Sequence, residues 1–304
     1  MAHNDDVPPP DDPPFDLAYI KPGTQIGFYT VETRLGAGDF GAVYKVWRDK
    51  EAFALKIGIA DCDEEGQVDR MPQEASVLLS LRHPNVIGAH ATDRWPGRNG
   101  PRFLVMDLVE GTALQKWVEG TRPSFAELAR VFSKIARALH EIHERHVFHR
   151  DIKSENVLIR RRDQEPILLD FGLAKSGAAR AMTEPGELVG SWSTQAPERC
   201  RWRLSAERRS VPLPYRPQED LYALGVMLYL ALTGEHPSGL KKSERRASME
   251  TLHRVVNHEI TNPREFFPMM PEALATAVMN LLAKDPARRF ANGEAAAVAL
   301  DKVR

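Results

Sequence analysis

The chain has little cysteine and almost no net charge, and each shortage excludes a class of protein. Among its 304 residues are two cysteines, Cys62 and Cys200, which lie far apart and in no metal-binding spacing. Their scarcity argues against a disulfide framework and favours a reduced, intracellular protein. The 41 basic and 42 acidic side chains leave a formal charge of -1, so no overall field attracts nucleic acid or an anionic membrane.

The chain also lacks a long apolar run and a secretory signal. Its longest apolar stretch, around Leu221–Leu232, is too short and too interrupted to span a membrane. The N-terminus is acidic and rich in proline, unlike a signal peptide. We therefore expect a cytoplasmic protein with no membrane span within this chain and no nucleic-acid partner.

What the chain does contain is enough apolar material for one large globular unit or two lobes, since 42% of its residues are hydrophobic. Ahead of this material, residues 1–26 hold Pro8-Pro9-Pro10 and Pro13-Pro14 among aspartates. Such a segment buries little and lacks amide donors, so we predict a flexible Pro/Asp-rich tail. A partner-binding peptide is the alternative.

The apolar pattern predicts strands first and helices afterwards. Strand-like alternation covers Tyr29–Leu35, Val43–Arg48, Ala52–Ile57 and Phe103–Leu108. Helical spacing or a fully apolar run covers Gln73–Leu81, Phe125–Glu144, Leu221–Leu232, Glu272–Ala283 and Gly293–Val303. The predicted fold class is α+β, with a small antiparallel sheet that carries one main helix, followed by a large, mostly helical part.

Five short motifs stand in a fixed order along the chain. They are G-x-G-x-x-G-x-V at 36–43, A-L-K at 54–56, H-R-D-x-K-x-x-N at 149–156, D-F-G at 170–172 and A-P-E at 196–198. Each string alone is weak, because three-residue matches recur by chance. Together they resemble the eukaryotic-like serine/threonine protein kinases, and the compact domain with its tail favours the bacterial members.

The resemblance implies a bilobal kinase domain over residues 27–304. Its N-lobe would cover residues 27–107, its hinge 107–111 and its C-lobe 112–304. The glycine motif lies between two strand patterns, which argues against a dinucleotide fold and for a lid over ATP phosphates. Lys56 lies in an apolar strand, where an unpaired ammonium is costly, and the resemblance pairs it with phosphates and with Glu74.

The family's ATP-binding positions map onto the glycine motif, the following strands, the hinge and one later apolar residue. They are Leu35, Gly36, Ala37, Gly38, Asp39, Phe40, Gly41, Val43, Ala54, Lys56, Glu74, Met106, Asp107, Val109 and Leu158.

The resemblance assigns the chemistry to Lys56 and to the two later motifs. Asp151 would accept the proton of a substrate hydroxyl, and Lys153 would neutralise charge on the transferred phosphoryl group. Asn156 and Asp170 would supply oxygen ligands to Mg²⁺, for which Mn²⁺ can substitute. Lys153 is typical of serine/threonine kinases, so we predict ATP-dependent transfer to Ser or Thr hydroxyls of protein substrates.

In the family, the activation segment corresponds to residues 170–198 of this chain. Three basic residues match positions that contact this segment when it is phosphorylated: Arg150, Arg70 and Lys175. Converging cations repel one another unless an anion joins them, and phosphothreonine is the usual anion. Thr183 is the first candidate for autophosphorylation. A permanent glutamate, Glu184 or Glu187, is the alternative.

The end of the activation segment departs from the common G-T-P-x-Y-x-A-P-E pattern. In the family, the usual threonine bonds to the residues that match Asp151 and Lys153. Ser191 can replace this threonine. Trp192 and Thr194 are unusual and alter the expected substrate groove.

Two structural anchors are also implied by the resemblance. Glu198 should pair with Arg289, and Asp220 should brace the backbone of the catalytic loop. Between these anchors, residues 199–216 hold six arginines, which form either a solvated loop or a docking surface for an acidic partner.

Two other functions compete with an active protein kinase. A pseudokinase or scaffold would bind partners without transferring phosphate. Such proteins typically lack the lysine, the catalytic aspartate or the metal-binding aspartate, and the matching residues Lys56, Asp151 and Asp170 are all present here. A small-molecule phosphotransferase is disfavoured by the A-P-E motif and the long activation segment, which serve protein substrates.

Overall fold

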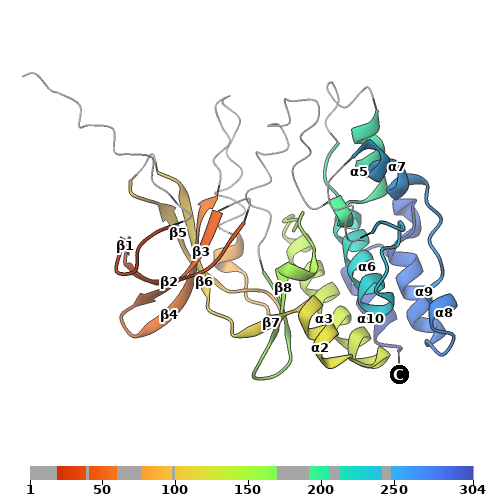
Figure 1. Cartoon of the computed structure of the whole chain (residues 1–304), viewed down its shortest axis with the longest axis horizontal. Helices are drawn as coiled ribbons and strands as arrows, with labels where there is room; N and C mark the ends of the chain where they lie inside the picture. The colour runs from red at the N-terminus through yellow and green to blue at the C-terminus, as the bar shows by residue number, and fades with distance from the viewer. Residues whose placement is uncertain are drawn as a thin grey trace, which may run out of the picture. The chain divides into compact units, whose positions relative to one another are not determined.

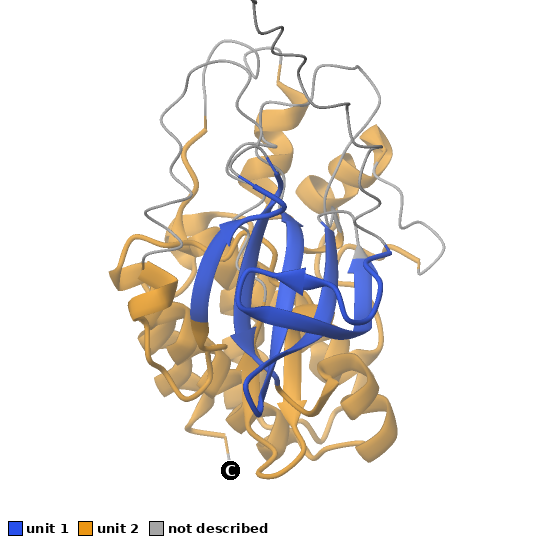
Figure 2. Ribbon diagram, turned by 90° about the vertical axis from the view of Figure 1, so that its left-hand side faces the viewer, with its two compact units in different colours: residues 1–61, 90–108 blue, residues 62–89, 109–304 orange. Residues whose placement is uncertain are grey.

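The structure is a computed structural model that describes residues 19–38, 41–59, 77–97, 100–169, 192–205, 213–241 and 248–303. The chain divides into two compact units (Figure 2): unit 1 comprises residues 1–61 and 90–108, and unit 2 comprises residues 62–89 and 109–304. Unit 1 is built from strands and unit 2 mainly from helices, so the predicted α+β class is confirmed. The described residues 77–89 group with unit 2, although the sequence placed them in the first lobe.

Unit 1 contains a six-stranded sheet in the order β1-β2-β3-β4-β6-β5, with antiparallel pairing along β1-β2-β3-β4-β6. All four predicted strands are present. The strands are β1 (Gln25–Ile26), β2 (Tyr29–Gly38), β3 (Gly41–Arg48), β4 (Glu51–Ile59), β5 (Ala89–Arg94) and β6 (Arg102–Asp107). The sequence missed β1 and β5, which are too short or too polar to show a clear alternation.

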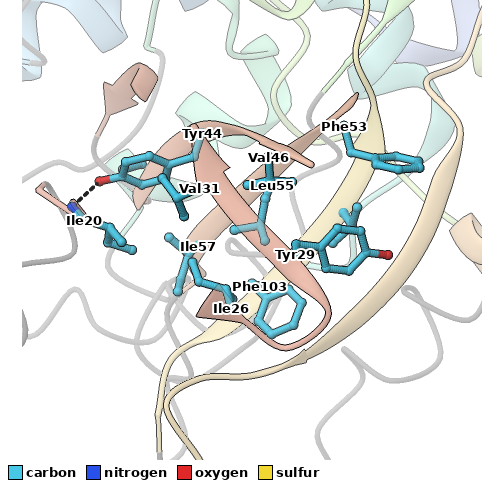
Figure 3. Packing of buried hydrophobic residues seen from close by; sticks show 12 residues of the cluster. Ile20, Ile26, Tyr29, Val31, Tyr44, Val46, Phe53, Leu55, Ile57 and Phe103 are labelled. Carbon is cyan, nitrogen blue, oxygen red and sulfur yellow. Dashed lines mark hydrogen bonds between the residues drawn. The ribbon is translucent and has the colours of Figure 1, made fainter. Parts of the chain in front are cut away.

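One face of this sheet forms the core of unit 1. Successive side chains of a strand point to opposite faces, so alternate residues of β3 and β4 are buried together. Figure 3 shows Tyr44 and Val46 of β3 gathered with Leu55 and Ile57 of β4 in this cluster. The other residues of β3 and β4 therefore face away from the core, and they include the predicted nucleotide-binding positions.

The predicted tail boundary at residue 26 lies too late. Ile20 and Ile26 are 4% and 0% exposed and belong to the core cluster. The backbone N–H of Ile20 donates to the hydroxyl of Tyr44 at 2.9 Å (Figure 3), and Ile26 pairs with Tyr29 across the β1–β2 turn. Burial of each isoleucine stabilises the fold. Residues 20–26 therefore belong to the folded unit, although the composition of the preceding residues is rich in proline.

Unit 2 consists mainly of helices (Figure 1). Helix α6 packs against α3 and α9, and α10 packs against the same two helices. The helices are α2 (Leu114–Thr121), α3 (Phe125–Glu144), α5 (Pro197–Leu204), α6 (Pro217–Thr233), α7 (Met249–Asn257), α8 (Pro263–Phe266), α9 (Glu272–Leu281) and α10 (Gly293–Leu300). A three-stranded sheet accompanies them, formed by β7 (Gly111–Ala113), β8 (Val157–Arg160) and β9 (Pro166–Leu168).

Helices α3 and α6 have clear local causes. The side chain of Ser124 accepts from the backbone of Glu127, whose carboxylate bonds back to Ser124, and this capping box starts α3 where the sequence predicted it. Helix α6 begins at Pro217 and ends at Thr233, and it is capped by Gly234, whose φ of 75° suits a residue without a Cβ. Of the predicted helix Gln73–Leu81, the described part comprises residues 77–81, of which 77–80 are helical.

The core position of Ile26 can be tested against its exposed neighbour Phe28. Ile26→Ala should lower the free energy of unfolding by about 2–5 kcal/mol, because it leaves a cavity in the core. Phe28→Ala should change it by less than about 0.5 kcal/mol, since Phe28 is 87% exposed. Urea denaturation measures both. Equal effects would contradict the placement of β1 in the core.

Candidate active site

Residues of the H-R-D-x-K-x-x-N motif at 149–156, the predicted catalytic loop, meet around Asp151 in unit 2. This carboxylate is 8% exposed and lies just before the short 3-10 helix η1 (Ser154–Asn156). Its Oδ2 lies 3.0 Å from Nζ of Lys153. The side-chain amide of Asn156 donates to the same oxygen at 3.1 Å and to the backbone oxygen of Asp151 at 2.7 Å. Three predicted site residues are therefore brought together, with the carboxylate held by two donors.

The orientation of Asn156 follows from these partners. Both are acceptors, so the amide nitrogen must face Asp151, and the carboxamide oxygen is turned to the other side. An amide oxygen is a ligand that Mg²⁺ accepts, so Asn156 fits the metal role expected of it. The backbone oxygen of Asn156 also accepts from the N–H of Leu169 at 2.8 Å. This bond places the residue just before Asp170 beside Asn156, while Asp170 itself lies outside the described residues.

A buried carboxylate fixes the loop that carries Asp151. Asp220, at the start of α6, is 0% exposed and accepts four hydrogen bonds. Its donors are the backbone N–H groups of His149 (2.9 Å) and Arg150 (3.0 Å), the hydroxyl of Tyr215 (2.8 Å) and the ring of His143 (2.8 Å). Burial raises the pKa of Asp220, but the bond and charge of His143 and the contacts with His149 outweigh it, so the pKa lies below its ordinary value.

This brace holds a strained backbone. Arg150 has a φ of 62°, which side chains with a Cβ adopt at a cost of about 1–3 kcal/mol. The bond from its N–H to Asp220 offsets that cost. The strained turn directly precedes Asp151, so the position of the Asp151 carboxylate depends on Asp220.

Tyr215 and His143 are anchors that the sequence did not reveal. Burial and the negative charge of Asp220 raise the pKa of Tyr215 well above its ordinary value, so its hydroxyl stays protonated and donates. The guanidinium of Arg150 lies 5.9 Å from the centre of the Tyr215 ring. Nothing in the spacing of Tyr215 or His143 marks them, because their role depends on chain segments that meet only in the fold.

In unit 1, the predicted nucleotide-binding side chains share the face opposite the core. Val43 pairs with Lys56 across β3 and β4, and Ala54 pairs with Met106 across β4 and β6. Directly paired residues lie on the same face of a sheet, so these four form one surface of three apolar side chains and a lysine. Leu35, 50% exposed, lies in β2 at an irregularity beside Gly36.

The third glycine of the glycine motif has a steric cause. Gly41 has a φ of 123°, and a Cβ there would lie 2.1 Å from the backbone oxygen of Ile57. Gly41 is therefore required by the close approach of β3 to β4. Gly36 and Gly38 pair with Val43 and Gly41. The tip between these strands, Asp39 and Phe40, lies outside the described residues.

The hinge residue Asp107 ends β6 with an unexpected partner. Its Oδ1 lies 2.6 Å from Nε2 of His90 in β5, and the His90 ring meets Phe53 edge-on at 5.0 Å. Asp107 pairs with Phe53 in the sheet, so its side chain lies on the core face, and Met106 lies on the opposite face with Ala54 and Lys56. Ala37 pairs with Ala42 between β2 and β3, and the candidates Val109 and Leu158 belong to unit 2.

The second predicted anchor joins α5 to the end of the helical part. Arg289 donates to both carboxylate oxygens of Glu198, at 2.8 and 2.7 Å. It also donates to the backbone oxygens of Gln218 and Ala283, and its guanidinium lies 4.9 Å from the centre of the Tyr222 ring. Every nitrogen of this buried guanidinium donates a hydrogen bond, which fixes the start of α5 within the A-P-E motif.

Several predicted residues lie outside the described part of the chain. Besides Asp39, Phe40 and Asp170, they are Glu74, Arg70, Lys175, Thr183 and Ser191. Their roles remain predictions.

The comparisons with known proteins agree with this fold and site. The family described as the protein kinase domain matches residues 29–299, and the chain belongs to this family. Serine/threonine-protein kinase PknH of Mycobacterium tuberculosis is 31% identical over 281 residues, which cover 91% of this chain and 42% of that protein. Serine/threonine-protein kinase PrkC of Bacillus subtilis is 26% identical over 273 residues, which cover 88% of this chain and 39% of that protein. The chain thus spans less than half the length of these relatives.

A solved structure is similar in fold. The crystal structure of the Mycobacterium tuberculosis PknI kinase domain matches with a TM-score of 0.69 and 24% identity, over 93% of this chain and 99% of that one. Among the described residues, no helix has the length and apolar character needed to cross a membrane.

The brace at Asp220 can be tested through stability at different pH values. Asp220→Asn should lower the free energy of unfolding by about 3–5 kcal/mol at neutral pH, because buried donors lose their anionic acceptor. The pKa of Asp220 is lowered by folding, so its contribution is present above its unfolded pKa of about 4 and is lost as the pH falls through the lower folded value. Urea denaturation from pH 7 to 3 should show the difference from the unchanged chain narrowing in acid.

Asp163→Asn is the matched control. The pKa of Asp163 is lowered to about 2, first by its bond from Arg160, yet this carboxylate is exposed, so its loss should change stability little. A similar loss in both variants would contradict the special role of Asp220.

Proposed function

We propose that this chain is the catalytic domain of an ATP-dependent serine/threonine protein kinase. The observation that carries this proposal is the cluster of Asp151, Lys153 and Asn156 on a loop braced by Asp220. Membership in the protein kinase domain family and the names of the bacterial relatives support it.

The residues act by positioning and by charge. Asp151, fixed by two donors, accepts the hydrogen bond and then the proton of a substrate hydroxyl. Lys153, 3.0 Å from that carboxylate, neutralises charge that develops on the transferred phosphoryl group. Lys56 holds the ATP phosphates on the nucleotide face of unit 1. Mg²⁺ or Mn²⁺, held by Asn156 and Asp170, would neutralise phosphate charge.

A pseudokinase is disfavoured because the three described catalytic-loop residues are both present and arranged to interact. A small-molecule phosphotransferase is disfavoured by the anchored A-P-E segment, since Arg289 fixes Glu198 at the end of a long activation segment.

Autophosphorylation with Mg-ATP and mapping of the modified sites tests this function. The unchanged chain should label Ser or Thr residues, and Asp151→Asn should slow transfer by about 10²–10⁴-fold, the typical contribution of a positioned base. Lys56→Met and Asp170→Ala should each abolish labelling while the protein stays folded. Asp163→Asn, in the turn between β8 and β9, is the control with full activity. Near-normal transfer by Lys56→Met or Asp170→Ala would refute the phosphate and metal roles.

The same experiment decides how the enzyme is controlled. We propose that phosphorylated Thr183 joins Arg150 with Arg70 and Lys175. Mapping should then find phosphate on Thr183. A fully active chain without modification there would favour Glu184 or Glu187 as the permanent anion.

We also propose that the arginine-rich segment 199–216 binds an acidic partner. Arg199 is excluded from this role, because it donates to both oxygens of Glu219 at 2.8 and 2.7 Å and to the backbone of Leu213. Arg201 and Arg216 are exposed and remain the described candidates.

Binding to poly-glutamate at two salt concentrations tests this surface. The double variant Arg201→Glu/Arg216→Glu should bind about 2- to 30-fold more weakly at low salt, as expected for two exposed ion pairs. Arg264→Glu, an exposed arginine on α8, is the control. Equal binding by the double variant and the unchanged chain would leave a solvated loop as the explanation.

A further inference from the structure

His236 lies in the turn that follows α6, and its ring is fixed by that turn. The backbone oxygen of His236 accepts from Gly239 at 2.8 Å, and its ring Nδ1 accepts from the N–H of Ser238 at 3.1 Å. The residue is 8% exposed. Its imidazole therefore has one defined orientation, set within four residues of chain.

The other ring nitrogen reaches the end of the activation segment. Nε2 of His236 lies 2.6 Å from the backbone oxygen of Ser193, in the 3-10 helix η2 (Trp192–Thr194). Because Nδ1 faces an N–H donor, it carries no proton, and the proton must be on Nε2, which donates to Ser193. Burial lowers the pKa of His236. The bond to the Ser193 carbonyl raises it, and the positive charges of nearby Lys284 and Arg254 lower it further, so the pKa lies below its ordinary value. A neutral ring is the state that satisfies both bonds.

The same arrangement occurs where the activation segment begins. Nδ1 of His149 accepts from the N–H of Asp151 at 3.3 Å, and its Nε2 lies 2.6 Å from the backbone oxygen of Leu169. Leu169 directly precedes Asp170. Two buried histidines thus bind the carbonyls on either side of segment 170–192, each with Nδ1 held by the N–H two residues ahead.

The contact at Ser193 is close to the chemistry along the chain. Ser193 follows Ser191, which we predict to bond Asp151 and Lys153, by two residues, a reach of at most about 7 Å. On its other side lie buried Thr194 and the anchored Glu198. We therefore expect a displaced Ser193 to shift Ser191 as well, and with it the contact that we predict beside the acceptor hydroxyl.

We propose that His236 is a positioning residue that shapes the protein-substrate groove by holding the Ser193 carbonyl. This inference rests on the proposed kinase function and specifies how it selects protein substrates. It assigns to His236 an effect on peptide binding and none on ATP binding.

Two substitutions separate the two bonds of the ring. In His236→Asn, the amide oxygen takes the place of Nδ1 and keeps the turn, but the side chain is too short to reach Ser193. In His236→Gln, the amide nitrogen takes the place of Nε2 and keeps the bond to Ser193. The pair is thus matched in chemistry and differs in which bond survives.

The test combines kinetics with hydrogen–deuterium exchange of the unliganded chain. His236→Asn should raise KM for a Ser/Thr peptide about tenfold, as expected for one lost buried hydrogen bond, with KM for ATP unchanged. It should also speed amide exchange in residues 192–196. His236→Gln should stay near the unchanged chain in both measurements.

Two results would overturn the inference. One is equal behaviour of the two variants, since a merely structural histidine would be damaged by either change. The other is unchanged exchange and unchanged peptide KM in His236→Asn. If the unchanged chain phosphorylates no peptide at all, the proposed function fails instead. The exchange rates then decide the Ser193 contact alone, and equal rates in both variants would refute it.

Discussion

Asp220 determines the geometry of the candidate active site, because its buried carboxylate accepts from the backbone N–H groups of His149 and Arg150, which directly precede Asp151. A fully buried carboxylate is costly unless donors surround it, and here two backbone N–H groups, a phenol and an imidazole do so. The cost of burial and the strain at Arg150 are met by the same set of bonds. Removing the carboxylate would therefore release both the loop and the strained turn.

The anchoring residues are more deeply buried than the candidate catalytic residues. Asp220 and the side chain of Arg289 are 0% exposed and use their polar atoms within the fold. The side chain of Lys153 is 28% exposed, and Asp151 lies between these extremes. This gradient is expected where rigid, desolvated pairs hold the more accessible side chains of a candidate site in place.

The sequence predicted the parts of this structure that local rules determine. Strong periodicity and a capping box located α3, and the motifs located Asp151, Lys153 and Asn156. Short or polar elements such as β1 and β5 gave no clear pattern. The predicted tail wrongly included Ile20 and Ile26, because it was inferred from the proline and aspartate content of the segment. The contacts of His143 and His236 span 77 and 43 residues of chain and leave no local pattern. Only the fold brings these groups together.

Histidine suits the carbonyls at the two ends of segment 170–192 better than a charged donor would. A lysine or arginine buried there would need an anion, and none of the described partners of His236 provides one. A neutral imidazole instead accepts from its own turn and donates to a distant carbonyl, so it joins two backbone segments without burying charge. His236 contacts a backbone oxygen, so its bond does not depend on which side chains the neighbouring residues carry. Residues 191–194 can therefore depart from the common family pattern without losing this anchor.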